Sequence, residues 1–423
     1  MNITIKPGRL SGKVRAPASK SAAHRALVCA ALGDALTTLR VNALNDDLEA
    51  TIDALTALGA VIDFDPRGER LAVRPIEGAP GLRRRIEGLE GRIAPHVDYG
   101  QRLTVDCGES GSTLRFMLPV TLALGARARF AGHGRLPERP NKPLTDALRA
   151  HGAVIDADTL PMNAEGPLRG GLWSLPGDVS SQYVTGLLLA LPLLPGDSEI
   201  RLTTLLASAP YVDMTLAMLR RFGITVEPAA GGWRVPGGQA YRSPGELAVE
   251  GDWSAAAFWL AANAFGGDIA VEGLSDDSAQ GDRAVARLLG RPEIDASNVP
   301  DLVPALAAAA AVLPQRTVIT GAARLRLKES DRLQTTAAVI NGLGGHAEIT
   351  ADGLVIEGGM PLAGGEVDGA NDHRIVMAAS ILATCCAGPT VIRGAEAVNK
   401  SYPAFFEHFR ALGGKCDVQP AGR

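Results

Sequence analysis

Cationic side chains recur beside hydroxyl groups at turns of this 423-residue chain. In residues 17–25, Ser19, Lys20 and Ser21 precede an Ala/Leu-rich stretch that is typical of a helix. Backbone N–H groups are unpaired in the first turn of a helix, and the helix dipole makes that end positive. Arg25 follows Ser21 by four residues and can lean back toward the point that Lys20 reaches. The segment therefore predicts an anion-binding site.

Comparable turns follow along the chain, most of them ahead of an apolar stretch. They cover residues 109–115, 135–143, 180–182, 208–211, 324–332, 371–374 and 398–403. Gly111 would let an anion approach the backbone closely. The hydroxyl and amide groups near residues 180–182 and 208 suit a polyhydroxylated substrate, although they can equally be helix caps. Asp301 heads a further apolar stretch, where a lone Asp is more often an N-cap than a base.

Seven cations from these segments are expected to line one site. They are Lys20, Arg25, Arg139, Lys328, Arg332, Arg374 and Lys400. Close like charges repel by roughly 1 to 4 kcal/mol per pair at intermediate dielectric. We therefore expect two multiply charged ligands carrying phosphate and carboxylate groups, which Arg binds through bidentate contacts.

The elements that must position these residues follow a repeated pattern. Six stretches that predict helices are each followed by a Gly, and the signal is weakest at the fourth. These glycines are Gly59, Gly152, Gly223, Gly290, Gly344 and Gly413. Gly at this position adopts the left-handed conformation that ends a helix. The spacing, near 70 residues, predicts six units mixing helices and strands, three in each of two domains.

Four stretches are apolar on nearly every side, which predicts helices at the centre of each domain and sheets outside them. These are residues 184–194, 255–265, 302–313 and 375–387. All fall short of the ~18 to 20 residues that a membrane span needs. Residues 1–10 predict a strand, residues 78–102 a surface excursion, and the Gly/Pro-rich residues 231–246 a domain crossover.

Composition excludes several classes of function. The net charge of -4 and the absence of long basic runs indicate neither a nucleic-acid nor a membrane-surface partner. Phosphate-loop, dinucleotide and HExxH motifs are absent, and the five cysteines lack metal-ligand spacing. The cysteines lie mostly in apolar runs, which favours buried free thiols in a reducing cytoplasm.

Taken in order, these motifs resemble the enolpyruvyl transferase family, in its 3-phosphoshikimate 1-carboxyvinyltransferase (EPSP synthase) branch. The match runs from residue 1 to the helix at residue 405 and rests on seven motifs that are jointly specific. The resemblance implies an inside-out α/β barrel of two domains, each with three βαβαββ units around buried helices. We expect one domain from residues 1–15 and 248–423, another from residues 16–247, and an active site in the interdomain cleft.

The resemblance also implies roles for individual residues. Shikimate 3-phosphate would be bound by Lys20, Ser21, Arg25, Ser180, Ser181, Gln182, Ser208, Tyr211, Asp301 and Lys328. Phosphoenolpyruvate would be bound by Lys20, Gly111, Arg139, Arg332, Arg374 and Lys400. Asp301 would be the proton acceptor and Glu329 the candidate proton donor, with Lys20 or Lys400 sharing these roles.

The implied reaction transfers the enolpyruvyl group to the 5-hydroxyl of shikimate 3-phosphate, with loss of phosphate, on the shikimate pathway to chorismate and aromatic amino acids. Neither a metal nor an organic cofactor is required, and we expect a cytoplasmic monomer. Two positions depart from the commoner family pattern, Glu109 before the Gly111 turn and Arg324. Gly111 leaves room for the inhibitor glyphosate, but these departures leave sensitivity open.

Two alternatives remain at this point. The sister transferase acting on UDP-N-acetylglucosamine typically has Lys-Asn near its start and a reactive Cys in a mobile loop, whereas here Ser21 follows Lys20 and residues 132–143 contain no Cys. A non-catalytic polyanion-binding module is the other. Such a module has little use for Asp301 and Glu329, since carboxylates weaken anion binding.

Overall fold

The computed structural model describes residues 1–76 and 102–419, so the expected excursion at residues 78–102 lies outside the description except for Arg102. The chain divides into two compact units, Met1–Ser19 with Glu250–Arg423, and Lys20–Val249. The stretch at residues 231–246 is not the crossover. It belongs to the continuous unit, where it forms β13 (Gly232–Val235) and reaches β14 (Glu246–Ala248).

The continuous unit contains three four-stranded sheets. Their orders are β14-β3-β5-β4, β6-β7-β9-β8 and β10-β11-β13-β12. The other strands are β3 (Thr37–Arg40), β4 (Val61–Asp65), β5 (Arg70–Arg74), β6 (Leu103–Asp106), β7 (Arg127–Ala131), β8 (Val154–Ile155), β9 (Met162–Glu165), β10 (Gly171–Leu175), β11 (Ser198–Leu202) and β12 (Glu227–Ala229). The helices are α1 (Lys20–Ala31), α2 (Asp46–Ala57), α4 (Gly111–Ala123), α5 (Lys142–Ala150), α6 (Ser181–Ala190) and α7 (Ala209–Arg221), with short η1 (Leu136–Glu138) and η2 (Leu191–Leu193).

The discontinuous unit has two four-stranded sheets, β20-β21-β1-β22 and β16-β17-β19-β18, and the pair β15-β2. Its strands are β1 (Asn2–Lys6), β2 (Ser11–Arg15), β15 (Asp268–Glu272), β16 (Glu293–Asp295), β17 (Arg316–Thr320), β18 (His346–Ile349), β19 (Leu354–Glu357), β20 (Gly365–Asp368), β21 (Thr390–Arg393) and β22 (Lys415–Gln419). Its helices are α8 (Trp253–Ala264), α9 (Val285–Leu288), α10 (Val303–Val312), α11 (Arg332–Gly342), α12 (His373–Ala383) and α13 (Phe405–Ala411). Short helices are η3 (Gly281–Ala284), η4 (Pro300–Leu302), η5 (Ala323–Leu327) and η6 (Ala395–Lys400).

The sheets share one plan, in which the first two strands in each four-stranded order are parallel and the other neighbours are antiparallel. In β16-α10-β17-α11-β18-β19 the chain order is the expected βαβαββ. The six helix-ending glycines all have positive φ, from 73° to 104°. The repeat that ends at Gly290 has the weakest sequence signal, and its sheet consists of the two strands β15 and β2. Only four residues separate α9 from β16, which leaves no room for two further strands. Within residues 1–76 and 102–419 the six sheets stay separate and form no closed barrel.

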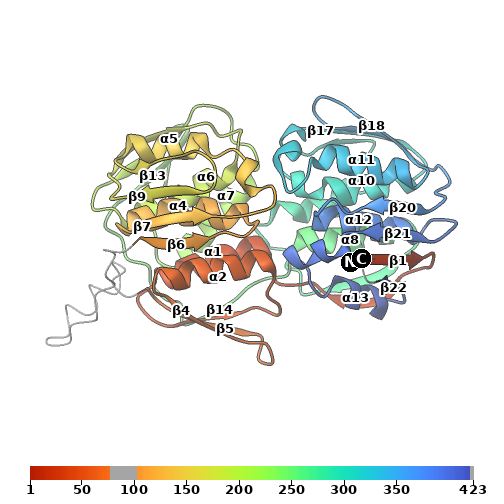
Figure 1. The fold of residues 1–423 in the computed structure, drawn as a ribbon, viewed down its shortest axis with the longest axis horizontal. Coiled ribbons are helices and arrows are strands. Elements are labelled where there is room, and N and C mark those ends of the chain that lie inside the picture. The colour runs from red at the N-terminus through yellow and green to blue at the C-terminus, as the bar shows by residue number, and fades with distance from the viewer. Residues whose placement is uncertain (77–101, 420–423) are drawn as a thin grey trace. The chain divides into compact units, whose positions relative to one another are not determined.

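Apolar helices form the core of each unit, as their sequence predicts. The stretches at residues 184–194, 255–265, 302–313 and 375–387 correspond to α6, α8, α10 and α12. In the discontinuous unit, α8, α10 and α12 pack against one another, while β20, β21, β1 and β22 lie outside them (Figure 1). Residues 305–311 of α10 are all buried and nearly all Ala, which allows close helix contacts. In the described parts of the chain, no helix combines the length and apolarity that crossing a membrane requires.

Candidate functional site

Hydrogen bonds join the first turns of four helices in the continuous unit. Lys20, the first residue of α1, places Nζ 2.6 Å from Oδ2 of Asp47 in the first turn of α2. The Asp47 carbonyl accepts from Thr113 Oγ1 of α4 at 3.4 Å. Ser112 of α4 accepts from Gln182 Nε2 of α6 at 3.0 Å. The N-termini of α1, α2, α4 and α6 therefore gather at one end of the unit, where their dipoles favour an anion.

Arg25 adds a buried charge and links a fifth helix to the same end. Its Nη1 donates to the Ser21 carbonyl at 2.6 Å, its Nη2 to the Tyr211 carbonyl at 2.9 Å, and its Nε to Thr215 Oγ1 at 2.8 Å. Burial lowers the pKa of Arg25 to about 10, so the guanidinium stays charged at neutral pH. Arg25 donates to groups of α1, α6 and α7, whereas Lys20 contacts Asp47 of α2. The two side chains thus engage different neighbours, and Arg25 acts mainly as a fixed positive field.

Gly111 sits beside two arginines at the start of α4. A Cβ built on Gly111 would lie 2.8 Å from Nη1 of Arg139 and 2.9 Å from Nη1 of Arg115. Arg115 donates to Gln182 Oε1 at 2.6 Å and to Asn141 Oδ1 at 3.2 Å, and is 3% exposed. Arg115 was not predicted as a site residue, although it closes the Ser110-to-Arg115 motif. It positions Gln182 and the segment that carries Arg139.

From the sequence, the serines at helix starts could be helix caps or ligands of a polyhydroxylated substrate. Ser180 is the N-cap of α6, and its side chain accepts from the Gln182 N–H at 3.3 Å. Ser181 is buried, and Ser208 is buried with a left-handed backbone at φ 57°, directly ahead of α7. A left-handed Ser costs backbone energy, and such strain concentrates at functional sites. The Ser180 hydroxyl therefore caps α6 and lies at the end where an anion is favoured, whereas the Ser208 side chain makes no cap hydrogen bond to α7.

In the discontinuous unit, Asp301 is surrounded by cations. Its Oδ1 lies 2.9 Å from Arg332 Nη1 and 3.2 Å from Lys328 Nζ. Its Oδ2 lies 3.2 Å from Nη2 of Arg374. Burial acts to raise the pKa of Asp301, but the three cations outweigh it and hold that pKa well below the usual range. Asp301 lies within η4, and the N-cap position of α10 is Leu302, so Asp301 is not the N-cap residue of α10.

Arg332, at the start of α11, joins three carboxylates. It contacts Asp372 through Nε at 2.7 Å and Glu329 through Nη2 at 2.7 Å, in addition to Asp301. Burial acts to lower the pKa of Arg332, but Asp372, Glu329 and Asp301 raise it above its ordinary value. Asp372 is fully buried, and it also caps α12 by accepting from the Arg374 N–H at 3.0 Å. Asp372 was not predicted as a site residue.

Lys400 reaches from η6 to the turn that precedes α12. Its Nζ donates to the Asn371 carbonyl at 2.6 Å, and its side chain is buried. Ala370 and Asn371 both have left-handed backbones, with φ of 52° and 51°. This turn directs the carbonyl toward Lys400 immediately ahead of α12.

The seven expected cations fall into two groups. Lys20, Arg25 and Arg139 belong to the continuous unit, and Lys328, Arg332, Arg374 and Lys400 to the discontinuous unit. Within each group, part of the repulsion between cations is offset before any ligand binds. The chain supplies carboxylates of its own, namely Asp47, Asp301, Glu329 and Asp372.

The two departures from the family pattern have local partners. Arg324 Nη2 donates to the Ser297 carbonyl at 2.8 Å, four residues ahead of Asp301. Glu109 Oε1 lies 3.8 Å from His133 Nδ1. Arg324 therefore helps to hold the segment leading to η4, and Glu109 belongs to the loop ahead of α4.

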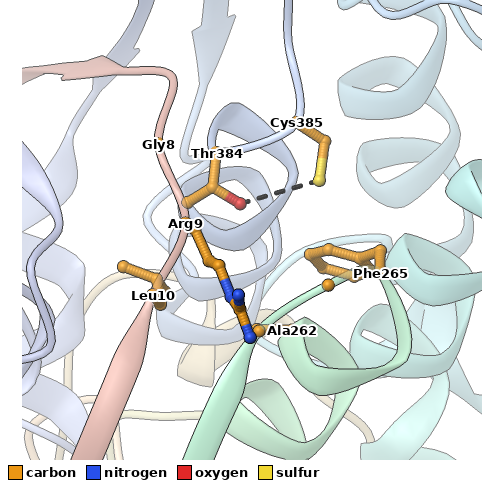
Figure 2. Close-up of a pocket in the computed structure, with 9 residues that line it drawn as sticks. Gly8, Arg9, Leu10, Ala262, Phe265, Thr384 and Cys385 are labelled. Atoms are coloured by element: carbon orange, nitrogen blue, oxygen red, sulfur yellow. Dashed lines mark hydrogen bonds between the residues drawn. The ribbon is translucent and has the colours of Figure 1, made fainter.

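A pocket of about 280 Å³ lies elsewhere in the discontinuous unit (Figure 2). It is lined by Arg9, by Phe265 at the end of α8 and by Thr384 at the end of α12. Arg9 is the one cation among its nine lining residues. Helix C-termini carry partial negative charge, so this pocket attracts an anion less strongly than the opposite end of α12, where Asp372 and Arg374 lie.

Positive helix ends in one unit, and a carboxylate held among cations in the other, define an α/β protein suited to small, multiply charged anions. The model of the EPSP synthase (3-phosphoshikimate 1-carboxyvinyltransferase) family matches residues 5–292 and 289–409, and the chain belongs to this family.

Relatives of known name agree with this family. The 3-phosphoshikimate 1-carboxyvinyltransferase of Clostridium kluyveri is 39% identical, over 100% of this chain and 99% of that protein. The Clostridioides difficile protein of the same name is 36% identical, over the whole of both chains.

Solved structures share the fold. EPSP synthase from Acinetobacter baumannii has a TM-score of 0.78 and 26% identity, with 99% of this chain and 100% of that chain covered. The enolpyruvyl transferase NikO from Streptomyces tendae, at 19% identity, resembles the fold with a TM-score of 0.74, over 100% of this chain and 99% of that chain.

Proposed function

We propose that this chain transfers the enolpyruvyl group of phosphoenolpyruvate to the 5-hydroxyl of shikimate 3-phosphate and releases phosphate. Its family and its relatives at 36% to 39% identity support this reaction. The observation that carries the mechanism is Asp301, a carboxylate placed among three cations. In this reaction the hydroxyl oxygen adds to C2 of phosphoenolpyruvate, C3 takes a proton, and phosphate then leaves.

The cations of both units act on this one pair of substrates. Lys20, Ser21, Arg25 and the residues at the starts of α6 and α7 hold shikimate 3-phosphate, together with Lys328 and Asp301. Gly111, Arg139, Arg332, Arg374 and Lys400 hold phosphoenolpyruvate, with Lys20 shared. Fixing two anions in reacting orientation can supply ~7 to 11 kcal/mol of the barrier. The chain passes from one unit to the other at residues 19/20 and 249/250.

Asp301 takes the proton of the 5-hydroxyl. In the free enzyme three cations stabilise the ionised carboxylate of Asp301 and hold its pKa well below its usual range. The negative charges of the substrate phosphate and carboxylate groups offset the positive charges of Lys328, Arg332 and Arg374. Asp301 then regains proton affinity when both substrates are present.

Glu329 serves the proton at C3. Its Oε2 lies 2.7 Å from Nη2 of Arg332, so Asp301 and Glu329 are both held by one guanidinium. Lys20 and Lys400 can share the proton-transfer roles. The reaction needs neither a metal nor an organic cofactor.

Phosphate release from the two substrates tests the function. We expect turnover with shikimate 3-phosphate and none with UDP-N-acetylglucosamine; the reverse would favour the sister transferase. Tight polyanion binding without turnover would favour a binding module. We also propose a cytoplasmic monomer, which the five unpaired thiols support for the compartment. Sedimentation velocity tests the monomer.

A further inference from the structure

Four buried polar side chains form a continuous series of hydrogen bonds inside the continuous unit. Nδ1 of His24 in α1 lies 2.8 Å from Oγ1 of Thr51 in α2. Thr51 Oγ1 lies 2.6 Å from Oγ1 of Thr113 in α4, and Thr113 Oγ1 donates to Ser110 Oγ at 2.8 Å. Each of the four residues is 1% exposed or less. We call them the buried network, and it links α1, α2 and α4 through side chains.

The protons of the buried network can be placed by counting donors. Thr113 uses its one hydroxyl proton on Ser110, so Thr51 must donate to Thr113. Thr51 then has no proton for His24, and the Nδ1–H of His24 donates to Thr51. Burial lowers the pKa of His24 well below its usual value, so the ring is neutral and Nε2 carries no proton. This agrees with Nε2, which bonds to no residue that the structure describes.

One side of the buried network holds the start of α2. Oγ1 of Thr51 and Oγ1 of Thr113 each lie 3.4 Å from the carbonyl oxygen of Asp47. The carboxylate of the same Asp47 lies 2.6 Å from Nζ of Lys20, the first residue of α1. The two threonines therefore fix the residue that fixes Lys20.

The other side of the buried network holds the start of α4. Ser110 is the N-cap of this helix, and its hydroxyl oxygen accepts from the Thr113 N–H at 3.1 Å as well as from the Thr113 hydroxyl. Gly111, which lies against Arg139 and Arg115, follows directly. Hydrogen bonds in such a buried network reinforce one another, and a lost member leaves its neighbours without partners away from water.

We propose that the hydroxyls of Thr51 and Thr113 position the starts of α1 and α4 for phosphoenolpyruvate binding. The inference rests on the proposed function, in which Lys20 of α1 and Gly111 of α4 both contact this substrate. Neither threonine touches substrate or exchanges a proton with it, so both are positioning residues. The proposed shikimate 3-phosphate ligands at the starts of α6 and α7 lie outside the buried network, and that substrate depends on it less.

The test measures the KM for each substrate in Thr113→Val, which lacks the hydroxyl but keeps a branched side chain. We expect a rise of about tenfold for phosphoenolpyruvate and about twofold or less for shikimate 3-phosphate, the size of effect of one lost hydrogen bond. Thr113→Ser restores the hydroxyl and should return the KM for phosphoenolpyruvate to within about twofold of the wild type. An unchanged KM in Thr113→Val, or equal impairment in Thr113→Ser, overturns the proposal.

Thr121→Val is the matched control. Thr121 belongs to the same helix and is fully buried, but its Oγ1 has no hydrogen-bond partner among the described residues. Both KM values are expected to stay at the wild-type level. A rise in the KM for phosphoenolpyruvate equal to that of Thr113→Val would show that any loss of a hydroxyl from α4 disturbs the site, and would overturn the proposal.

Thr51→Val breaks the buried network from α2 and decides the matter if Thr113→Val fails to fold. The same selective rise in the KM for phosphoenolpyruvate is expected. The double variant should be no more impaired than Thr113→Val alone, because both hydroxyls act through one network. Effects that multiply in the double variant would show that the two threonines act independently, against the proposal.

These outcomes separate the buried network from the proposed function. A wild type without turnover on the two substrates contradicts the function itself. An active wild type in which Thr51→Val and Thr113→Val both keep the wild-type KM for phosphoenolpyruvate contradicts the positioning role alone.

Discussion

Arg332 and Asp372 meet through two contacts, Nε to Oδ2 at 2.7 Å and Nη2 to Oδ1 at 3.2 Å, in the interior of the discontinuous unit. This geometry fixes the plane of the guanidinium. Nη1 then faces Asp301 and Nη2 faces Glu329. Asp372 therefore orients, through Arg332, both carboxylates that are proposed to move protons.

Asp372→Asn is expected to destabilise the protein and lower turnover, because it leaves the buried charge of Arg332 with a neutral partner. Breaking one side of a buried ion pair costs about 3 to 5 kcal/mol. Asp368→Asn is the control, since Asp368 is exposed and pairs with exposed Arg393, where a change of about 1 kcal/mol or less is expected. Chemical denaturation measures both. Equal stability of the two variants would show that the Asp372 pair contributes little.

Arg25→Ala and Asp301→Ala are expected to fail in different ways. Loss of Arg25 removes a buried positive charge and the hydrogen bonds that Arg25 donates to the Tyr211 carbonyl and to Thr215, so shikimate 3-phosphate should bind far more weakly. Loss of Asp301 should lower kcat by about 100-fold or more, the usual effect of removing a general base. Calorimetric titration and steady-state kinetics distinguish the two. Comparable loss of substrate affinity in both, with turnover intact in Asp301→Ala, would count against these roles.

Gly111→Ala is expected to raise the KM for phosphoenolpyruvate more than that for shikimate 3-phosphate. The new methyl group would lie 2.8 Å from Arg139 Nη1 and 2.9 Å from Arg115 Nη1, closer than side chains tolerate. Both guanidiniums must move, and Arg139 is the proposed phosphoenolpyruvate ligand. Gly125→Ala in the same unit is a control for an added methyl group, because open space surrounds it, although its positive φ adds backbone strain. Unchanged phosphoenolpyruvate kinetics in Gly111→Ala would remove Arg139 from that role.

His24 is expected to make stability depend on pH. Burial, and then the charges of Lys20 and Arg25, lower the pKa of His24 well below 6.5. The unfolded chain therefore binds the proton more readily, so stability is lost as pH falls below about 6.5. Between pH of about 7.5 and about 5.5 the wild type should lose about 1.4 kcal/mol more than His24→Gln. Denaturation at the two pH values measures this difference. Equal losses of stability in the wild type and in His24→Gln would show that a group other than His24 takes up the proton.

The repeat could be predicted from the sequence because a helix in each repeat ends at a Gly, where the backbone requires a positive φ. The apolar helices were accessible because burial on every side leaves no polar stripe. One sheet contains only β2 and β15, and the sequence indicated this weakly. The helix ending at Leu289-Gly290 is followed so closely by β16 that too few residues remain for two further strands.

The cations of the candidate site were recognised from their motifs, but their carboxylate partners were not. Asp47 is 27 residues from Lys20, and Asp372 is 40 residues from Arg332. Tertiary packing rather than sequence spacing brings such pairs together. A signal existed in both cases, since Asp47 and Asp372 each lie at the start of a helix that follows a turn. Arg115 likewise closed a motif from which only Gly111 was taken.

Strand β1 lies between β21 and β22, which the ribosome makes long after it. Its backbone must remain without these partners until about four hundred further residues have been synthesised. The segment Lys20–Val249 has all its own strands long before that point and can fold during translation. Ile3 and Ile5, fully buried once β1 is paired, are then the residues that a chaperone would have to shield while the chain emerges.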